Sequence, residues 1–402
     1  MDLRSAGHTD LRSRNTHLLL HLIQTDGPIS QADLARRSGL SPSTVSGIIQ
    51  PLIENRLLIA TGKNTNQGMG RRASLLSFNR DTLMTVGVVV EPDECKIALV
   101  DFAGTVIGCT DLAYYPPYQP KQFSQFIQDK LRELLQEYDI RRSVIVGIGM
   151  ALPGLIDGEL GIVKAAINLG WRNVPIKQII EEQLQIPVSI ENVGKAKIAT
   201  ETIWGTGVDC NNIVLIEIGS GIGGGAVVDG HLLKGATYSA AEIGHTSLIY
   251  DGPACQCGLK GCWEVLCSGP AIRERIRYTL SNHPDAMTKL NRESNLHDLQ
   301  NAAESGDPIA LSVIQETAIL MARGLANVIW NFDPEMFILT GYVVENCQIL
   351  IDATQDELKK IQAVRSMNIP LVKAKQGSDF GVVSASALVS QRYLEEISYC
   401  SE

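Results

Sequence analysis

The chain has 402 residues, of which 45% are hydrophobic, and this is enough to bury more than one core. A single small module is therefore excluded, and two or three domains are expected. Residues 1–80 carry ten Lys and Arg against five Asp and Glu, a balance of +5, which leaves −14 for residues 81–402 within the net charge of −9. A basic segment joined to an acidic body is typical of an appended DNA-binding module, provided that a motif supports it.

The N-terminus is polar and carries arginines, without the apolar segment of a signal peptide, and no stretch reaches the roughly 18 uninterrupted apolar residues of a membrane-spanning helix. Three of the nine cysteines crowd into Cys255-Gln256-Cys257-Gly258-Leu259-Lys260-Gly261-Cys262. This spacing favours a metal site over a disulfide framework, and reduced thiols indicate a reducing compartment. We therefore expect a cytoplasmic protein with no membrane contact.

The first 60 residues have the spacing of a helix-turn-helix. The leucine-rich run at residues 17–23 predicts a first helix, which the turn Thr25-Asp26-Gly27-Pro28 ends. Ser30-Gln31-Ala32-Asp33 is a capping box for a short second helix that Gly39 stops. Ser41-Pro42 then supplies the N-cap and first residue of a third helix.

The third helix is the predicted DNA-reading helix. Its apolar residues share one face, and the small polar residues on the other face are the expected readers of a DNA groove. These expected DNA contacts are Ser43, Thr44, Ser46, Gly47 and Gln50. Short hydroxyl and amide side chains suit phosphate oxygens and base edges in a major groove. Pro51 lies inside this helix, and we expect it to kink or shorten the helix.

Two β-rich runs, at residues 57–60 and 73–78, surround a Gly- and Asn-rich loop that ends in Gly70-Arg71-Arg72. The pattern predicts a wing whose basic tip, Arg71 and Arg72, contacts a minor groove or phosphates. A plain helical hairpin is the alternative, but capped helices, a wing and positive charge coincide here. Residues 1–80 resemble the winged helix-turn-helix head of the ROK-family repressors, including the Gly-Arg-Arg-x-x-x-Leu wing.

Residues 81–402, the body, alternate strand and helix patterns. β-rich runs precede an amphipathic helix and a buried strand, an order typical of an α/β lobe with a mixed sheet. Further β-rich runs follow later in the body. The runs lie at residues 85–90, 96–101 and 105–108, the helix at 122–137, the buried strand at 143–150, and the recurrences at 213–228 and 335–341. The recurrence is compatible with two duplicated lobes and a cleft between them, although no exact repeat is visible.

Six motifs follow one another through the body. They are Ala151-Leu152-Pro153-Gly154-Leu155-Ile156-Asp157, Asn168-Leu169-Gly170-Trp171, Glu191-Asn192, the glycine run at residues 219–225, Glu242-Ile243-Gly244-His245, and the segment from Cys255 to Glu264. In order and spacing they resemble the ROK family of repressors, open reading frames and sugar kinases. The resemblance implies an actin-like, ribonuclease-H-like α/β fold with lobes at residues 81–195 and 196–402, the last helix packing back on the first lobe.

The resemblance adds a histidine to the clustered cysteines. The implied ligand set of three thiolates and one imidazole is Cys255, Cys257, Cys262 and His245. This set has the number and softness of ligands of a closed structural Zn²⁺ site, whereas the alternative is three reduced thiols in a core loop. A closed site offers no open coordination position, so we expect it to brace the flanking Glu242 and Glu264 and to take no part in catalysis.

The resemblance also implies a sugar site in the cleft. Carboxylates and carboxamides grip vicinal hydroxyls through paired hydrogen bonds. The positions that match the family's sugar contacts are Gly154, Asn168, Asn192, Glu242, His245 and Glu264. For Asn168 and Asn192 the alternative role is local turn capping. Lys195 and Lys197 are interpreted as solvated helix lysines, with contact to a sugar phosphate as the alternative.

Three departures from the family's kinases argue against phosphoryl transfer. Kinases have Glu-Asn-Asp, whose aspartate is a general base, but this chain has Glu191-Asn192-Val193. The kinase phosphate loop Asp-x-Gly-Gly-Thr is replaced by Val89-Val90-Glu91-Pro92-Asp93, which crowds the turn and repels phosphates. Leu339-Thr340-Gly341-Tyr342 has a tyrosine where a second glycine is usual. We therefore predict no catalytic residue and no bound ATP.

The sequence thus predicts a repressor of carbohydrate-metabolism genes, resembling the xylose-, N-acetylglucosamine- and glucose-responsive members of the family. It is expected to bind operator DNA as a homodimer or tetramer, with an affinity that a sugar or sugar phosphate changes. One alternative is an ATP-dependent sugar kinase with an appended DNA-binding head. Another is a DNA-binding protein whose body is a dimerisation scaffold or a docking site for a further protein.

Overall fold

The computed structural model describes residues 9–63, 74–91, 95–111, 119–208, 210–361, 368–375, 377 and 379–399. The chain forms two compact units. Unit 1 comprises Met1–Ala196 together with Gln376–Glu402, and unit 2 comprises Lys197–Lys375.

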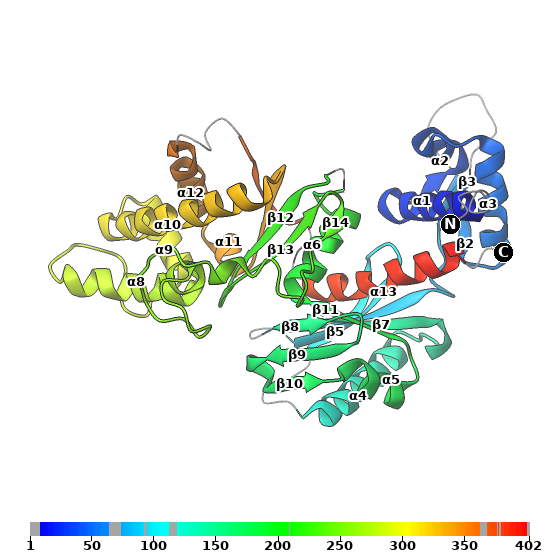
Figure 1. The fold of residues 1–402 in the computed structure, drawn as a ribbon, viewed down its shortest axis with the longest axis horizontal. Helices are drawn as coiled ribbons and strands as arrows, with labels where there is room; N and C mark the ends of the chain where they lie inside the picture. Colours follow the sequence, from blue (N-terminus) through cyan, green and yellow to red (C-terminus); the bar gives the residue numbers. More distant parts are fainter. Residues whose placement is uncertain are drawn as a thin grey trace. The chain divides into compact units, whose positions relative to one another are not determined.

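Residues 9–63 and 74–78 of unit 1, the head, form a three-helix domain with a small antiparallel sheet (Figure 1). Its elements are α1 (Thr9–Asp26), β1 (Ile29–Ser30), α2 (Gln31–Ser38), α3 (Pro42–Glu54), β2 (Leu58–Lys63) and β3 (Ser74–Phe78), with strand order β1-β3-β2. Ser30 begins α2 by accepting the Asp33 N–H at 3.1 Å, and Gly39 ends it with a φ of 69°. Ser41 caps α3 by accepting the Thr44 N–H at 3.1 Å. The predicted helix-turn-helix and its caps are therefore present.

The head differs from the sequence prediction in three details. The first helix begins at Thr9, earlier than expected, and β1 is an additional strand that pairs with β3. Pro51 does not shorten α3, which continues to Glu54. A proline removes one helical hydrogen bond, and the carbonyl that loses its partner belongs to the exposed Gly47, where water can replace the bond.

A five-stranded mixed sheet forms the centre of unit 1. It consists of β4 (Met84–Val90), β5 (Cys95–Asp101), β6 (Val106–Asp111), β7 (Ile145–Leu152) and β11 (Val188–Asn192), in the order β11-β7-β4-β5-β6. Figure 1 shows α4 (Pro120–Glu137) and α5 (Ile176–Leu184) on one face and α13 (Phe380–Tyr399) on the other. A short 3₁₀ helix, η1 (Arg142–Val144), precedes β7. A smaller antiparallel sheet comprises β8 (Leu155–Asp157), β9 (Ile162–Ala166) and β10 (Trp171–Val174).

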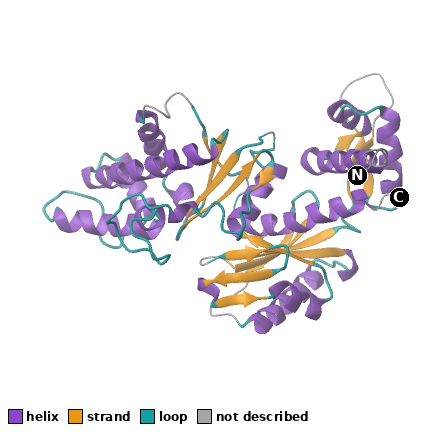
Figure 2. Cartoon of the chain, viewed as in Figure 1, coloured by secondary structure: helices purple, strands orange, loops and turns teal. Residues whose placement is uncertain are grey.

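Unit 2 has its own five-stranded sheet. It consists of β12 (Ile213–Ile218), β13 (Ile222–Val228), β14 (His231–Leu232), β15 (Met336–Thr340) and β16 (Leu371–Lys373), in the order β14-β13-β12-β15-β16. Helix α6 (Val193–Trp204) leads into the unit. The other helices, several of which gather beside the strands in Figure 2, are α7 (Trp263–Cys267), α8 (Gly269–Asn282), α9 (Leu296–Glu304), α10 (Pro308–Phe332), α11 (Tyr342–Asn346) and α12 (Gln348–Lys360).

The two large sheets share one topology. In each, the first three strands form an antiparallel meander, and the fourth and fifth strands run parallel to the first on its other side. The resulting order is third, second, first, fourth, fifth in both units. The sequence pattern was compatible with a duplication, and the shared strand order makes the duplication explicit.

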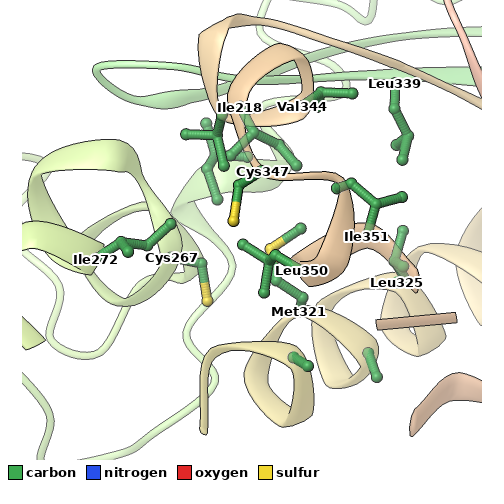
Figure 3. Packing of buried hydrophobic residues seen from close by; sticks show 14 of the residues in the cluster. Ile218, Cys267, Ile272, Met321, Leu325, Leu339, Val344, Cys347, Leu350 and Ile351 are labelled. Atoms are coloured by element: carbon green, nitrogen blue, oxygen red, sulfur yellow. The ribbon is translucent and has the colours of Figure 1, made fainter. Parts of the chain in front are cut away.

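The core of unit 2 lies between its sheet and its helices. Buried side chains from α7, α8, α10 and α12 pack together there with Cys347, which lies between α11 and α12; they include Cys267, Ile272, Met321 and Leu350 (Figure 3). Helix α10 is long and apolar enough to cross a membrane by length and composition, but 61% of its apolar window is buried inside the protein. This burial is typical of the central helix of a globular core.

Candidate functional site

Four metal-ligand side chains meet in unit 2. They are His245, Cys255, Cys257 and Cys262, and their ligand atoms all lie within 4.8 Å of one another. His245 Nδ1 is 3.6 Å from Cys255 Sγ, and Cys257 Sγ is 3.6 Å from Cys262 Sγ. A tetrahedral ion with bonds of about 2.3 Å has ligands about 3.7 Å apart, so this donor set fits Zn²⁺. The cluster is a candidate zinc site.

The backbone around the cluster needs glycine at two turns. Gly258 and Gly261 have φ values of 94° and 62°. A Cβ on Gly261 would lie 1.9 Å from the carbonyl oxygen of Ile249, so a larger residue has no room there. His245 comes from a separate segment, at the end of the 3₁₀ helix η3 (Ile243–His245). The loop is therefore folded to present its thiols toward the histidine.

Two of the thiols differ in acidity in the absence of a metal. Burial raises the pKa of the Cys262 thiol to about 12, and hydrogen bonding with Cys257 adds to the increase. The N–H of Leu259 lowers the pKa of Cys257. Because zinc binds thiolates, metal uptake must release the proton that Cys262 otherwise keeps.

The predicted sugar contacts of unit 2 surround the glycine run. Glu264 Oε2 accepts the Ile222 N–H at 3.1 Å, and a Cβ on Gly221 would lie only 2.4 Å from that oxygen. Gly244, which precedes His245, is equally close to the run, since its Cβ would lie 2.0 Å from the Ile222 carbonyl oxygen. Glu242 is half-buried immediately before η3. The two motifs and the glycine run therefore form one cluster, in which one oxygen of Glu264 is already engaged.

The other three predicted sugar contacts lie in unit 1. Asn192 Nδ2 donates to the Gly154 carbonyl at 2.9 Å, and its Oδ1 accepts the Lys195 N–H at 3.3 Å. Gly154 has a φ of 90°, and a Cβ there would lie 2.2 Å from the Ala165 carbonyl oxygen. Asn168 is exposed on the 3₁₀ helix η2 (Ile167–Leu169). Asn192 therefore takes part in the local turn, and Asn168 is accessible.

The position of the kinase base is apolar. Val193 is 6% exposed and belongs to a buried cluster with Val89, Ala151 and Val382. A carboxylate among these side chains would pay a large desolvation cost, so the surroundings suit valine and do not suit an ionised base.

Tyr342 occupies space beside the glycine run. Its ring carbons lie 3.6 Å from the place of a Cβ on Gly219, and its hydroxyl lies 2.0 Å from the place of a Cβ on Gly269. The tyrosine that replaces the usual glycine thus packs against both backbones. Of the altered phosphate loop at residues 89–93, Pro92 and Asp93 lie outside the described residues.

The prediction that Lys195 and Lys197 are solvated is wrong. Their exposed fractions are 1% and 4%. Lys197 Nζ pairs with Glu217 Oε1 at 2.7 Å, and a buried ammonium is tolerated when a carboxylate pairs with it. Helical periodicity did not reveal this burial because the partner is on another element.

The polar face of α3 is accessible. Thr44 is half-buried, and the other predicted DNA contacts are exposed: Ser43, Ser46, Gly47 and Gln50. Gln50 Nε2 donates to Glu54 Oε1 at 3.0 Å, so DNA would have to compete for this amide. Arg71 and Arg72 of the predicted wing tip lie outside the described residues.

The residues that join the head to the rest of unit 1 were not predicted from the sequence. Gln24 Nε2 of α1 donates to Ser390 Oγ of α13 at 3.1 Å, and Phe102 packs 5.4 Å from Phe78, measured between ring centroids. These partners are too distant in the sequence for a spacing motif to reveal them.

Comparison with known proteins agrees with the fold. Residues 85–392 match the family model described as the ROK family, and residues 12–59 match one described as winged helix-turn-helix DNA-binding. The chain belongs to the ROK family. The predicted family and the order of a winged head followed by a two-lobed body are thereby confirmed.

Both regulators and kinases occur among the relatives of this ROK protein. The xylose repressor of Bacillus subtilis is 28% identical, and the match covers 98% of this chain and 99% of the repressor. A crystal structure of a ROK family transcriptional regulator, a homolog of the E. coli MLC protein, has a TM-score of 0.79 at 26% identity and covers 96% of this chain and 98% of its own. The glucokinase of Halalkalibacterium halodurans is 29% identical over 76% of this chain and 95% of its own. The near full-length matches are thus to regulators.

Proposed function

We propose that this ROK protein is a sugar-responsive transcriptional repressor that binds operator DNA through α3. One observation carries the proposal: a head with an exposed polar reading face belongs to the same chain as a body in which the base position, Val193, is buried among apolar side chains. The near full-length similarity to a xylose repressor supports regulation over phosphorylation.

We infer that a sugar or sugar phosphate is the signal. The proposed contacts are Gly154, Asn168, Asn192, Glu242, His245 and Glu264. His245 Nδ1 faces Cys255, which leaves the protonated Nε2 to donate to a sugar hydroxyl while Nδ1 ligates zinc. The proposed zinc ion supplies rigidity at η3 and α7, which carry His245 and Glu264, and at Glu242, which directly precedes η3.

The proposed partners follow from the same reasoning. DNA is read by α3 and by Arg71 and Arg72, and a homodimer or tetramer supplies one head to each half-site. The free cysteines of the cluster and the proposed DNA target support a cytoplasmic location.

Thermal unfolding of the zinc-loaded protein against a panel of hexoses, pentoses, amino sugars and their phosphates tests this proposal. A sugar at a hundredfold its dissociation constant should stabilise the protein by about 2.7 kcal/mol. The Glu242→Gln variant should lose the shift, whereas Glu293→Gln, at an exposed position of the same unit, should keep it. A panel without any shift would favour a body that acts as a scaffold or docks another protein.

The kinase alternative is tested by adding ATP to the same panel and by a coupled assay of ADP release. We expect no thermal shift with ATP and no sugar-dependent release of ADP, because Val193 cannot accept a proton from a sugar hydroxyl. Sugar-dependent ADP release would contradict the proposal.

A further inference from the structure

The hydrophobic core of the head is completed by residues from outside the head. Leu20 of α1 and Ile49 of α3 share one buried cluster with Phe102, which follows β5, and Leu394 of α13. The ring of Phe102 also packs edge-on against Tyr393, with centroids 5.6 Å apart. The predicted DNA-reading helix α3 therefore packs on a core to which α13 contributes.

The N-terminal half of α13 is seated on the sheet of unit 1. Gly87 of β4 and Gly149 of β7 have no room for a Cβ, which would lie 2.0 Å and 1.7 Å from the carbonyl oxygens of Val382 and Ala385. A hydrogen bond of 2.5 Å joins the hydroxyls of Thr85 and Ser386. The glycines let the helix backbone approach the strands closely, so a shift of β4 or β7 must displace α13 as well.

The C-terminal half of the same helix meets the head through a buried polar pair. Gln24 and Ser390 are 4% and 0% exposed, and their side chains are joined at 3.1 Å. A buried amide or hydroxyl without a partner is costly, so sliding or rotation of α13 past α1 is penalised. Apolar contacts tolerate such slips, whereas this pair defines one register.

The end of α3 is fixed by a second set of contacts. The carbonyl of Arg56, two residues after α3, accepts Asn79 Nδ2 at 2.9 Å and the Thr82 hydroxyl at 2.7 Å. Arg80, between them in the sequence, pairs with the buried Asp101 at 2.6 Å. The segment that connects head and body is thus held by specific bonds, and it does not act as a free tether.

We propose that α13 sets the orientation of the DNA-reading helix relative to the β4–β7 sheet, with Gln24 and Ser390 as positioning residues that fix its register. This inference rests on the proposed DNA binding. It extends that function by naming the element and the contact through which a change in the body reaches α3.

Hydrogen exchange of the full-length protein, followed by mass spectrometry, tests the register contact. Ser390→Ala leaves the Gln24 amide without its hydroxyl partner. We expect exchange in α1 and α3 to rise about tenfold, the change that about 1.4 kcal/mol produces, with β4 and β7 unchanged. The matched control is Ser384→Ala, which removes a buried hydroxyl bonded only within α13, to the Phe380 carbonyl. Equal exchange in α1 and α3 for both variants would overturn the proposal.

A paired substitution separates positioning from stability. Gln24→Leu combined with Ser390→Ala replaces both polar groups by apolar ones, so unfolding should return close to that of the wild type. We then measure the affinity of the double variant for a duplex that the wild type selects from a random library. This affinity should still differ at least severalfold from that of the wild type, because the register of α13 against α1 is no longer specified. Wild-type affinity in this double variant would refute the positioning role. If the wild type selects no duplex, the proposed function fails, while the exchange experiment still decides the role of α13.

Discussion

Gly47 is exposed on α3, and a Cβ at this position would meet no atom within 4 Å. Gly47→Ala should therefore stabilise the helix by about 0.5–1 kcal/mol, since alanine loses less entropy in a helix. If this face reads DNA, the added methyl group should also weaken binding by about tenfold. Chemical unfolding and fluorescence anisotropy measure the two effects. The salt dependence should stay the same, because no charge is altered. Unchanged DNA affinity would remove Gly47 from the reading face.

Single residues were predictable from the sequence where their partners are close by. Three of the four candidate zinc ligands lie within one short segment, so their spacing alone indicated a metal. The bond from Ile222 to Glu264 and the pairing of Lys197 with Glu217 depend on the tertiary fold. No local pattern contains that information.

Asp307 caps α10, the longest helix of the described chain. Its Oδ1 accepts the Ile309 and Ala310 N–H groups, and its Oδ2 accepts the Thr288 hydroxyl at 2.8 Å and the Lys289 N–H at 2.7 Å. Burial alone would raise the pKa of Asp307, but these hydrogen bonds outweigh it and hold the pKa below its ordinary value. The cap therefore stabilises the folded state through its ionised form.

Asp307→Ala should lower the free energy of unfolding by about 1–2 kcal/mol at neutral pH, because three N–H groups and the Thr288 hydroxyl lose their acceptor. Since the folded-state pKa is depressed, this contribution is present above the unfolded value near 3.9 and is lost as the pH falls through the folded value. Urea unfolding at pH 7 and pH 3 measures the difference in free energy of unfolding between the wild type and the Asp307→Ala variant. This difference should be smaller at pH 3. Asp285→Ala, at an exposed position before α9, is the control. A constant difference at both pH values would contradict the role of the ionised carboxylate.

Elements with strong local signals were predicted well. The serine caps and Gly39 identified α2 and α3, and alternating β-rich runs identified β4 to β7. The two-residue β1 was missed because its pairing with β3 is the only feature that defines it. The packing of α13 on the first lobe was predicted only through the family resemblance. The need for glycine at positions 87 and 149 is visible only once the helix that packs against them is known.

At the scale of the whole molecule, the two large sheets repeat one strand order without a recognisable sequence repeat. Strand order depends on which hydrophobic faces pair, and many sequences satisfy the same pairing. The recurring β-rich runs of the sequence were therefore only compatible with a duplication, whereas the shared strand order shows it directly.

Zinc removal tests the proposed link between the metal cluster and the sugar contacts. Stripping the metal with a chelator should weaken sugar binding, because His245 is itself a proposed ligand and Glu264 lies two residues after the ligand Cys262. Calorimetric titration of the responsive sugar, before and after chelation, measures the change. Cys257→Ser should reproduce the loss, whereas Cys210→Ser, outside the cluster, should not. Equal sugar affinity with and without zinc would show that the metal braces only its own loop.

The most direct test of the central claim is a titration of the full-length, zinc-loaded protein onto a labelled duplex that it has selected from a random library. The titration is repeated with each sugar and sugar phosphate. We predict that one ligand changes the dissociation constant for this duplex by about 5- to 150-fold, the range of a coupling free energy of about 1–3 kcal/mol. The same dissociation constant with every sugar, or no selected duplex at all, would contradict a sugar-responsive repressor.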